Sequence, residues 1–144
     1  MNITISTEKS KLDIALIHKY LSEDSYWAKK IPLSIVERAI ENSLNFGVYD
    51  GEKQVGFARI TTDYASFAYL ADVFILPDYR GNGLSKQLVK YIIEYPDLQG
   101  LRRWMLGTAD AHELYRKYGF KELANPDRFM EIAYPSIYEN QKSD

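Results

Sequence analysis

The stretch "PDYRGNGLSKQLVKYII", residues 77–93, places Gly81 and Gly83 directly before a run of regularly spaced apolar residues. These apolar residues recur at intervals of three and four, which predicts an amphipathic helix that Pro96 ends. Residues 67–76, just before the stretch, are nearly all apolar, as in a strand that is buried on both faces of a sheet. The sequence therefore predicts a strand, a glycine loop and a helix in succession.

Such a loop has the chemistry of an anion site. The first turn of a helix exposes unpaired N–H groups and the positive end of the helix dipole. Glycines let an anion approach the backbone, and Arg80 and Lys86 add positive charge. Phosphate or pyrophosphate is the natural ligand, and a simple strand-to-helix turn with surface charges is the alternative. A nucleotide site is disfavoured, because GxxxxGK[ST] is absent and Lys86 occupies the sixth position of GxGxxG.

Composition narrows the class of protein. The chain of 144 residues suits a single domain over residues 1–144, and its hydrophobic fraction of 46% is enough for a packed core. It has no cysteine and two histidines, so we expect neither a disulfide nor a metal site. The net charge of -2, without a long basic run, disfavours a general nucleic-acid binder. No signal-peptide pattern or membrane-length apolar run is present, so we expect a cytoplasmic protein without a membrane partner.

Apolar periodicity and turn signals predict ten elements in the order β-α-α-β-β-β-α-β-α-β. Asp50-Gly51 marks a hairpin, and Asp110 with Glu113 forms a capping box for the last helix. This order indicates a mixed α/β or α+β domain around one sheet. The predicted strands cover residues 2–6, 44–50, 53–62, 67–76, 101–108 and 128–134. The predicted helices cover residues 11–20, 32–40, 84–95 and 110–118.

Two motifs resemble those of the GNAT superfamily, the Gcn5-related N-acetyltransferases. "ILPDYRGNGLS", residues 75–85, is similar to the pattern Arg/Gln-x-x-Gly-x-Gly/Ala after a strand, with Ser85 at the last position. "AHELYRKYGF", residues 111–120, is similar to the later pattern A-x-x-L-Y-x-K-x-G-F. Thr108 stands where the family often has a cofactor-binding asparagine. The resemblance implies a GNAT fold, with a mixed, mostly antiparallel sheet and helices on both faces.

The resemblance also implies acetyl-CoA as the cofactor. Its pyrophosphate would lie on the backbone amides of residues 81–86, and its pantetheine arm would lie beside residues 72–76, where the family's strand splays from its neighbour. The backbone N–H of Val73 would polarise the thioester carbonyl. A homodimer is common in the family. The cofactor-binding residues implied are Val73, Phe74, Ile75, Arg80, Gly81, Asn82, Gly83, Leu84, Ser85, Lys86, Thr108 and Tyr115.

The reaction implied is direct attack of an acceptor amine on the thioester. The departing thiolate needs a proton, and the family motif assigns that role to Tyr115, whose phenol has an ordinary pKa of about 10. Tyr115 also lies on an apolar helix face, so packing against the sheet is a second reading, compatible with the first. Asp72, in the buried strand, is a candidate base or a partner of an arginine at position 59, 102 or 103.

Four aromatic residues are candidates for the acceptor pocket, where they could hold a cationic or aromatic amine. They are Tyr26, Trp27, Tyr64 and Phe129. Twelve tyrosines in the chain also fit ordinary packing. The resemblance thus implies an N-acetyltransferase that acts on a primary amine of a small molecule or peptide. The alternative is a non-catalytic module that binds acyl-CoA as a sensor or for a partner.

Overall fold

A computed structural model describes residues 1–140 and contains one five-stranded sheet in the order β1-β2-β3-β4-β5. Neighbouring strands are antiparallel from β1 to β4, whereas β4 and β5 are parallel. The sheet is therefore mixed and mostly antiparallel, as expected. The strands are β1 (Ile3–Ser6), β2 (Leu44–Asp50), β3 (Lys53–Thr62), β4 (Phe67–Ile75) and β5 (Arg103–Leu106).

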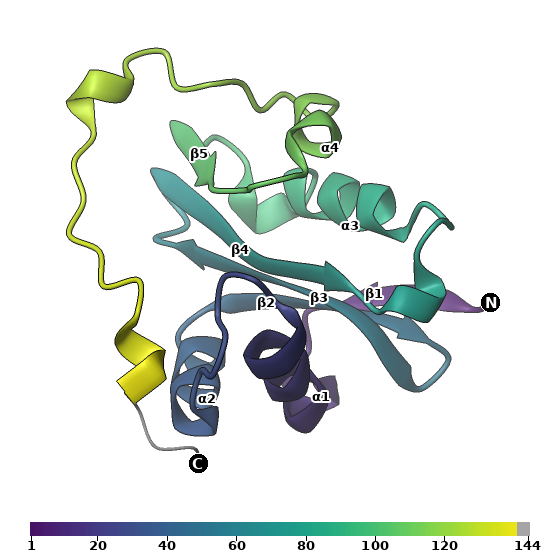
Figure 1. Cartoon of the computed structure of the whole chain (residues 1–144). Coiled ribbons are helices and arrows are strands. Elements are labelled where there is room, and N and C mark those ends of the chain that lie inside the picture. Colours follow the sequence, from purple (N-terminus) through teal and green to yellow (C-terminus); the bar gives the residue numbers. More distant parts are fainter. Residues whose placement is uncertain (141–144) are drawn as a thin grey trace.

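Helices cover both faces of this sheet, with α1 and α2 on one side and α3 and α4 on the other (Figure 1). The α-helices are α1 (Ile14–Lys19), α2 (Leu33–Glu41), α3 (Leu84–Ile93) and α4 (His112–Arg116), and a π-helical segment (Tyr20–Asp24) continues α1. Short 3-10 turns lie at Lys9–Lys11, Pro77–Tyr79, Pro96–Leu98, Pro126–Arg128 and Ile137–Asn140. The four predicted helices are thus confirmed in order and place; α1, α3 and α4 are shorter than predicted, and α2 has the predicted length with a shift of one residue.

The core has two layers, separated by the sheet. One cluster joins α3 and Tyr115 of α4 to buried residues of β2, β3 and β4, such as Phe46 and Leu70. The other packs α1 and α2 against Phe57 of β3 and Phe74 of β4. Because β4 contributes to both clusters, it is a nearly continuous apolar run, as the sequence predicted for residues 67–76.

The hairpin between β2 and β3 lies where Asp50-Gly51 predicts it. Asp50 pairs with Lys53, and Gly51 has a φ of +61°, which glycine adopts without a steric penalty. The Asp50 carboxylate also accepts hydrogen bonds from the backbone N–H of Asn2 and from the Tyr79 hydroxyl, both 2.9 Å long. The turn is thereby joined to β1 and to the segment before the glycine loop.

The predicted capping box at the start of α4 is not formed. The helix begins at His112 after Ala111, and no side chain caps it. Instead, the Thr108 hydroxyl accepts hydrogen bonds from the backbone N–H groups of Ala111, at 3.1 Å, and Asp110, at 3.4 Å. Glu113 pairs with Arg116 one turn later. The prediction was wrong because the tight loop after β5 brings Thr108 to these N–H groups first.

The predicted last strand, residues 128–134, is also wrong. This segment is extended, but it pairs with no strand among residues 1–140. The Phe129 ring lies 4.8 Å from the Arg103 guanidinium, and Tyr138 packs against the cluster of α1 and α2. From one contact to the other, the chain runs down one side of the molecule (Figure 1). A strand requires a neighbouring backbone, and the chain's own course supplies none here.

Candidate active site

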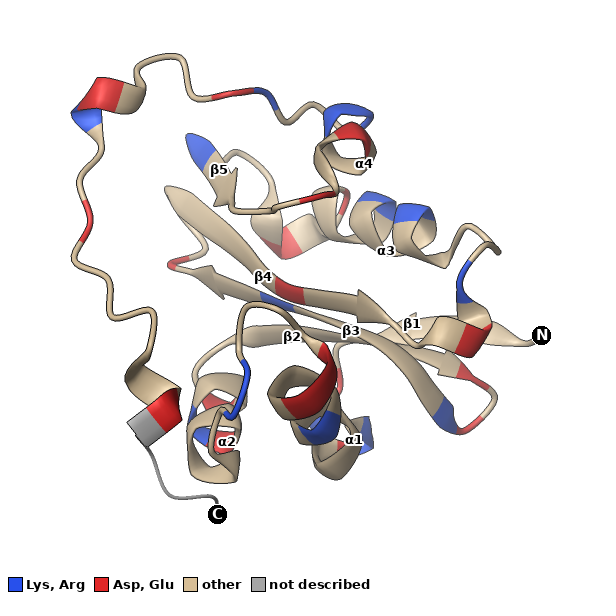
Figure 2. Ribbon diagram, viewed as in Figure 1, with Lys and Arg blue, Asp and Glu red and all other residues tan. Residues whose placement is uncertain are grey.

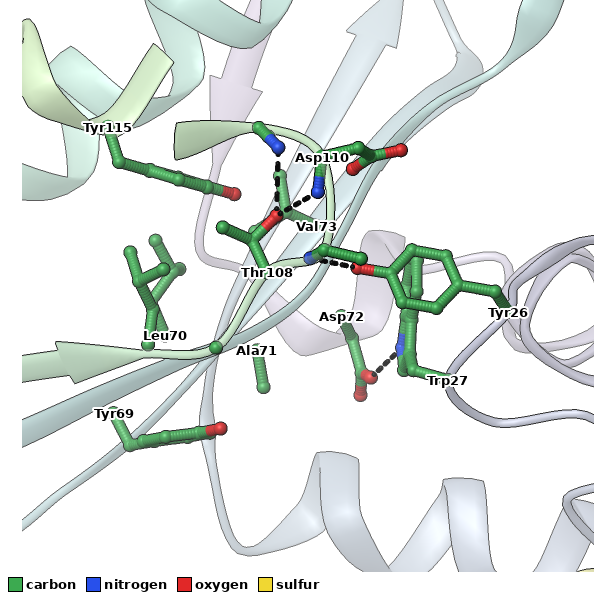
Figure 3. A pocket seen from close by; sticks show the side chains of 14 residues that line it. Tyr26, Trp27, Tyr69, Leu70, Ala71, Asp72, Val73, Thr108, Asp110 and Tyr115 are labelled. Atoms are coloured by element: carbon green, nitrogen blue, oxygen red, sulfur yellow. Dashed lines mark hydrogen bonds between the residues drawn. The ribbon is translucent and has the colours of Figure 1, made fainter. Parts of the chain in front are cut away.

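The candidate active site lies where β4 and β5 part. The two strands pair from Phe67 with Arg103 to Leu70 with Leu106, after which β5 ends and β4 continues to Ile75. The divergence expected from the family resemblance is therefore present. A cavity of about 450 Å³ occupies this position (Figure 3). It is lined by Tyr26, Trp27, Tyr69, Leu70, Ala71, Asp72, Val73, Leu106, Gly107, Thr108, Ala109, Asp110, Ala111 and Tyr115.

A β-bulge in β4 shapes one wall of this cavity. The pairing with β3 passes from Ala71 opposite Arg59 to Phe74 opposite Phe57, which leaves Asp72 and Val73 outside the regular register. Asp72 has a φ of +56°, a conformation that aspartate adopts more readily than most residues. Bulges re-aim side chains, and this one leaves Asp72 and Val73 lining the cavity.

The Asp72 carboxylate joins three elements. One oxygen accepts a hydrogen bond from the Trp27 indole N–H at 2.9 Å, and the other pairs with the Arg59 guanidinium at 2.8 Å. The Asp72 and Arg59 side chains are only 13% and 20% exposed, so neither charge is left without a counter-charge. Among the three arginines that the sequence offered, Arg59 is therefore the partner.

The loop after β5 forms the opposite wall. The Tyr26 hydroxyl accepts a hydrogen bond of 2.8 Å from the backbone N–H of Ala109, which ties the segment after α1 to this loop. Thr108 holds the loop from inside through its bonds to the next N–H groups. The rings of Tyr26 and Trp27 meet edge to face with centroids 5.0 Å apart. Two of the four predicted acceptor aromatics are thus brought to the cavity.

Tyr115 projects from α4 with its hydroxyl pointing into the cavity (Figure 3). Its side chain is buried, and its ring meets Phe120 edge to face at 5.9 Å. Burial, with smaller contributions from Tyr26 and Asp110, raises the pKa of Tyr115 to about 12. The phenol therefore stays protonated at neutral pH. The packing of the ring in the core is therefore confirmed, and the hydroxyl reaches the cavity, whereas the role of Tyr115 as the acid stays a prediction.

The glycine loop follows β4 and opens α3. Gly81 and Gly83 have φ values of +81° and +75°, and Gly83 occupies the N-cap position. A Cβ at either position would meet no atom within 4 Å, so the backbone angle rather than crowding requires glycine. No side chain caps α3 and no acidic residue lies in its first turn, whereas Lys86 is exposed there. The loop thus keeps the features of an anion site.

The Arg80 side chain forms two hydrogen bonds within the fold that the sequence analysis did not predict. Its guanidinium donates to the backbone carbonyl of Ile75 at 2.9 Å and to the Tyr20 hydroxyl at 3.0 Å. It therefore joins the end of β4 to the π-helical segment that follows α1. The positive charge stays beside the glycine loop, although these bonds direct the guanidinium toward Ile75 and Tyr20. Lysine and arginine otherwise lie on helices, strands and loops alike (Figure 2).

The other predicted residues lie apart from the cavity. Tyr64 is in the β3–β4 hairpin and is 51% exposed, and Phe129 lies on Arg103 beyond α4. Neither lines the cavity. Tyr69 of β4, Leu106 of β5 and Gly107 of the following loop do line it, and the sequence analysis missed them. They belong to no motif, and only the divergence of the strands exposes them.

Two further observations concern residues 1–140. These residues contain no group of three or more histidine or acidic side chains arranged to hold a metal ion. They also contain no helix that is both long and apolar enough to cross a membrane.

Comparison with known proteins identifies the class to which this fold and site belong. Residues 14–120 match the model of the acetyltransferase (GNAT) family. A candidate acetyltransferase of Gibberella zeae is 33% identical, over 92% of this chain and 87% of its own length. The chain therefore belongs to the GNAT family and is an acyltransferase.

Solved structures agree with this assignment. The crystal structure of a candidate GNAT acetyltransferase from Xanthomonas campestris pv. campestris is 51% identical, with a TM-score of 0.95 over 97% of this chain and 99% of that one. A GNAT acetyltransferase from Elizabethkingia anophelis, solved with acetyl-CoA bound, has a TM-score of 0.64 at 16% identity, over 92% of this chain and 88% of that one. The second likeness concerns the fold alone. Members of the family thus use acetyl-CoA as co-substrate.

Proposed function

We propose that this chain transfers an acetyl group from acetyl-CoA to a primary amine of a small molecule or peptide. One observation carries the proposal: the unpaired edge of β4 and the Tyr115 hydroxyl meet in one cavity. An extended thioester can pair with the edge of β4 while its sulfur lies near the Tyr115 hydroxyl. The glycine loop continues from the same strand, which suits a cofactor with a pyrophosphate at one end and a thioester at the other.

The residues that would hold the cofactor are backbone groups for the most part. The amides of residues 81–86 would receive the pyrophosphate, with Lys86 adding charge. Among the described residues, no strand pairs with residues 72–75 of β4 on their β5 side, so their backbone is available to the pantetheine amides. Thr108 lies across the cavity from them, although its hydroxyl already caps its own loop.

The chemical step then forms a C–N bond and breaks a C–S bond. The neutral amine attacks the thioester carbonyl, whose developing negative charge is stabilised by the N–H of Val73 in the bulge. As the tetrahedral intermediate collapses, the C–S bond electrons leave on sulfur. Tyr115 supplies a proton to the sulfur while the C–S bond breaks, so that CoA leaves as a thiol, and the amine nitrogen gives up one proton toward the Tyr115 oxygen.

The raised pKa of Tyr115 bears on how this proton moves. A phenol with a pKa of about 12 and a thiol with a pKa of about 8.5 differ by about 5 kcal/mol in proton affinity. Full transfer to an already formed thiolate would therefore be unfavourable. Transfer during C–S cleavage, coupled to loss of the amine proton toward the Tyr115 oxygen, avoids a free phenolate and leaves the phenol unchanged.

Asp72 is better suited to hold the Trp27 side chain in place than to remove a proton from the acceptor amine. Both of its oxygens already accept hydrogen bonds, one from Trp27 and one from the positively charged Arg59. These two contacts hold the carboxylate toward Trp27 and Arg59. We propose that Asp72 fixes the Trp27 indole at the mouth of the cavity, where Tyr26 and Trp27 form an aromatic wall for the acceptor.

Thermal unfolding with acetyl-CoA tests the cofactor, with ATP and NAD as controls. Acetyl-CoA at 100 times its Kd should add about 2.7 kcal/mol to the free energy of unfolding, and the controls should add nothing. No shift at saturating acetyl-CoA would overturn the proposal.

An amine screen that detects released thiol then tests catalysis, and the chain adds no thiol signal because it has no cysteine. Amine-dependent release is the expected result. Acetyl-CoA binding without turnover on any amine class would favour the non-catalytic acyl-CoA-binding module instead.

A further inference from the structure

A second cavity lies between the sheet and the helices α1 and α2, and the proposed function does not use it. We call this cavity, of about 190 Å³, the α1–α2 pocket. Most of its lining is buried and apolar, and comes from Ile17, Leu21, Ile31, Val36, Ile40 and Phe57. A cavity of about 150 Å³ with a lining of this kind stays dry and is large enough to bind benzene. The α1–α2 pocket therefore has the size and the surface for a small apolar group.

The α1–α2 pocket adjoins the candidate active site. Trp27 and Asp72 line both this pocket and the cavity between β4 and β5. Their side chains meet in the hydrogen bond of 2.9 Å at the edge of that cavity (Figure 3). Val73, whose N–H we propose for the thioester carbonyl, is the next residue, and consecutive Cα atoms are about 3.8 Å apart. A molecule with one end in the pocket thus needs only a short chain to bring an amine to the thioester.

The charges at this end of the pocket already have partners. Arg59 and Asp72 are the charged residues of the lining, and they pair with each other at 2.8 Å. The Arg59 guanidinium also donates to the Ser43 hydroxyl at 3.2 Å and to the Thr61 hydroxyl at 3.4 Å. A charged group placed in the pocket would therefore have no counter-charge of its own, which is costly in an apolar cavity.

The wall that carries Trp27 is fixed before any ligand binds. Ser25 is 1% exposed, and its hydroxyl donates to the backbone carbonyl of Leu21 at 2.7 Å. The same hydroxyl accepts a hydrogen bond of 3.0 Å from the backbone N–H of Ala28. These bonds hold the loop on both sides of Trp27 against the end of α1. A pocket that is already formed loses little conformational entropy when it is filled.

Tyr138 lies at the outer side of the pocket. It belongs to the 3-10 turn Ile137–Asn140, which lies beside α2 (Figure 1). Its ring lines the α1–α2 pocket and packs, partly buried, against the cluster of α1 and α2. Trp27 and Asp72 thus mark the end of the pocket at the active site, and Tyr138 closes another side.

We propose that the α1–α2 pocket binds an apolar group, about the size of a benzene ring, which a short chain joins to the acceptor's primary amine. The acceptor is then a hydrophobic amine of the arylalkylamine class, rather than a polyamine or an amino acid. Tyr138 limits the length of its apolar part. The inference rests on the proposed function, because it names the acceptor of that acetyl transfer.

Three amines test the substrate class in the thiol-release assay. Burial of a phenyl ring should give phenethylamine a kcat/KM at least about 100-fold higher than that of ethylamine, which has the same amine without the ring. Putrescine carries a second charge and should react no better than ethylamine. Equal values for phenethylamine and ethylamine, or a preference for putrescine, would overturn the inference while leaving the proposed acetyl transfer in place.

A binding measurement tests the pocket without turnover. The chain has two tryptophans, so Trp104→Phe leaves Trp27, in the pocket wall, as the fluorescent reporter. Phenethylamine should change the Trp27 emission with a Kd at least about 100-fold below that of ethylamine. If no amine is acetylated, the proposed function fails, and this titration still decides whether the pocket binds apolar amines. No response to phenethylamine would overturn the inference.

Filling the pocket tests its place in the structure. Ala39 of α2 lines the pocket, so Ala39→Leu should raise the Kd of phenethylamine at least about tenfold and leave that of ethylamine unchanged. Glu37→Leu adds the same side chain at an exposed position of the same helix and should change neither Kd. Circular dichroism of both variants should match the wild type. An equal loss for both amines in Ala39→Leu would overturn the inference.

Tyr138→Ala opens the outer side of the pocket without removing a buried side chain. The Kd of phenylbutylamine, whose chain is longer, should fall at least about tenfold relative to that of phenethylamine. An unchanged ratio of the two Kd values would show that Tyr138 does not limit the length of the acceptor.

Discussion

We propose two roles for Tyr115, whose ring completes the packing of α4 while its hydroxyl reaches the cavity. Tyr115→Phe separates them by keeping the ring. We expect kcat to fall at least about 100-fold, since general acid catalysis typically contributes that much or more. Acetyl-CoA affinity should stay within about twofold, measured by the thermal shift. Steady-state thiol release gives kcat.

Tyr118→Phe is the matched control, since Tyr118 lies two residues past the same helix and packs against the same core cluster without lining the cavity. Its kcat should stay close to that of the wild type. If Tyr115→Phe kept full activity, Tyr115 would not be the acid.

The same side chain makes stability depend on alkaline pH. Its pKa is about 12 in the folded chain and about 10 when unfolded, so the folded state holds its proton more tightly. The resulting stability is fully present below pH 10 and is lost as pH rises toward 12. Chemical denaturation from pH 8 to 11 should therefore show a smaller loss for Tyr115→Phe than for the wild type. Equal losses of unfolding free energy in the variant and the wild type would contradict the raised pKa of Tyr115.

For single residues, the sequence predicted which side chains belong to the site better than it predicted which side chains contact one another. The motif pointed to Tyr115 and Thr108, and both line the cavity. Asp72 was recognised as a carboxylate that needs a partner, but three arginines were open to it. The bulge in β4 and its pairing with Arg59 of β3 decided among them. A bulge depends on both strands, so the sequence of one strand does not reveal it.

At the scale of elements, the role of the glycine loop before α3 can be tested by comparing two glycines that both have a positive φ. Gly83 and Gly100 have φ values of +75° and +79°, and an added Cβ would meet nothing within 4 Å at either. Gly83→Ala and Gly100→Ala should therefore cost a similar free energy of unfolding, about 1–2 kcal/mol. Only Gly83→Ala should weaken acetyl-CoA, by about tenfold, because the strained N-cap displaces the amides that receive pyrophosphate.

Isothermal titration with acetyl-CoA, together with urea unfolding, measures both quantities for the two variants. Equal affinities would mean that the start of α3 takes no part in binding. A loss of affinity in Gly100→Ala as well would mean that general destabilisation, rather than the loop, is responsible.

The whole molecule places one layer of helices on each face of a shared sheet (Figure 1). Trp27 lies on the side of α1 and α2, and Trp104 packs against the cluster of α3 and α4. Because β3 and β4 contribute to both clusters, we expect the layers to unfold in one transition. Trp104→Phe leaves Trp27 as the fluorescent reporter of the α1 and α2 layer. Trp27→Phe leaves Trp104 as the fluorescent reporter of the α3 and α4 layer.

In each variant, the fluorescence midpoint should coincide with the circular dichroism midpoint of the same variant. A fluorescence transition several degrees before the loss of secondary structure would indicate that one layer unfolds separately. The chain would then contain two folding units instead of the single domain expected over residues 1–144.

The sequence by itself determined the features that depend on neighbours in the chain. Glycine at positive φ, an amphipathic helix after a buried strand and a two-residue hairpin all follow from local backbone angles and side-chain periodicity. The tertiary structure alone decided where β4 and β5 part, which arginine meets Asp72, and that residues 128–134 stay outside the sheet. A strand exists only beside another strand, and a cavity exists only between elements. Both are therefore set by contacts between residues far apart in the sequence.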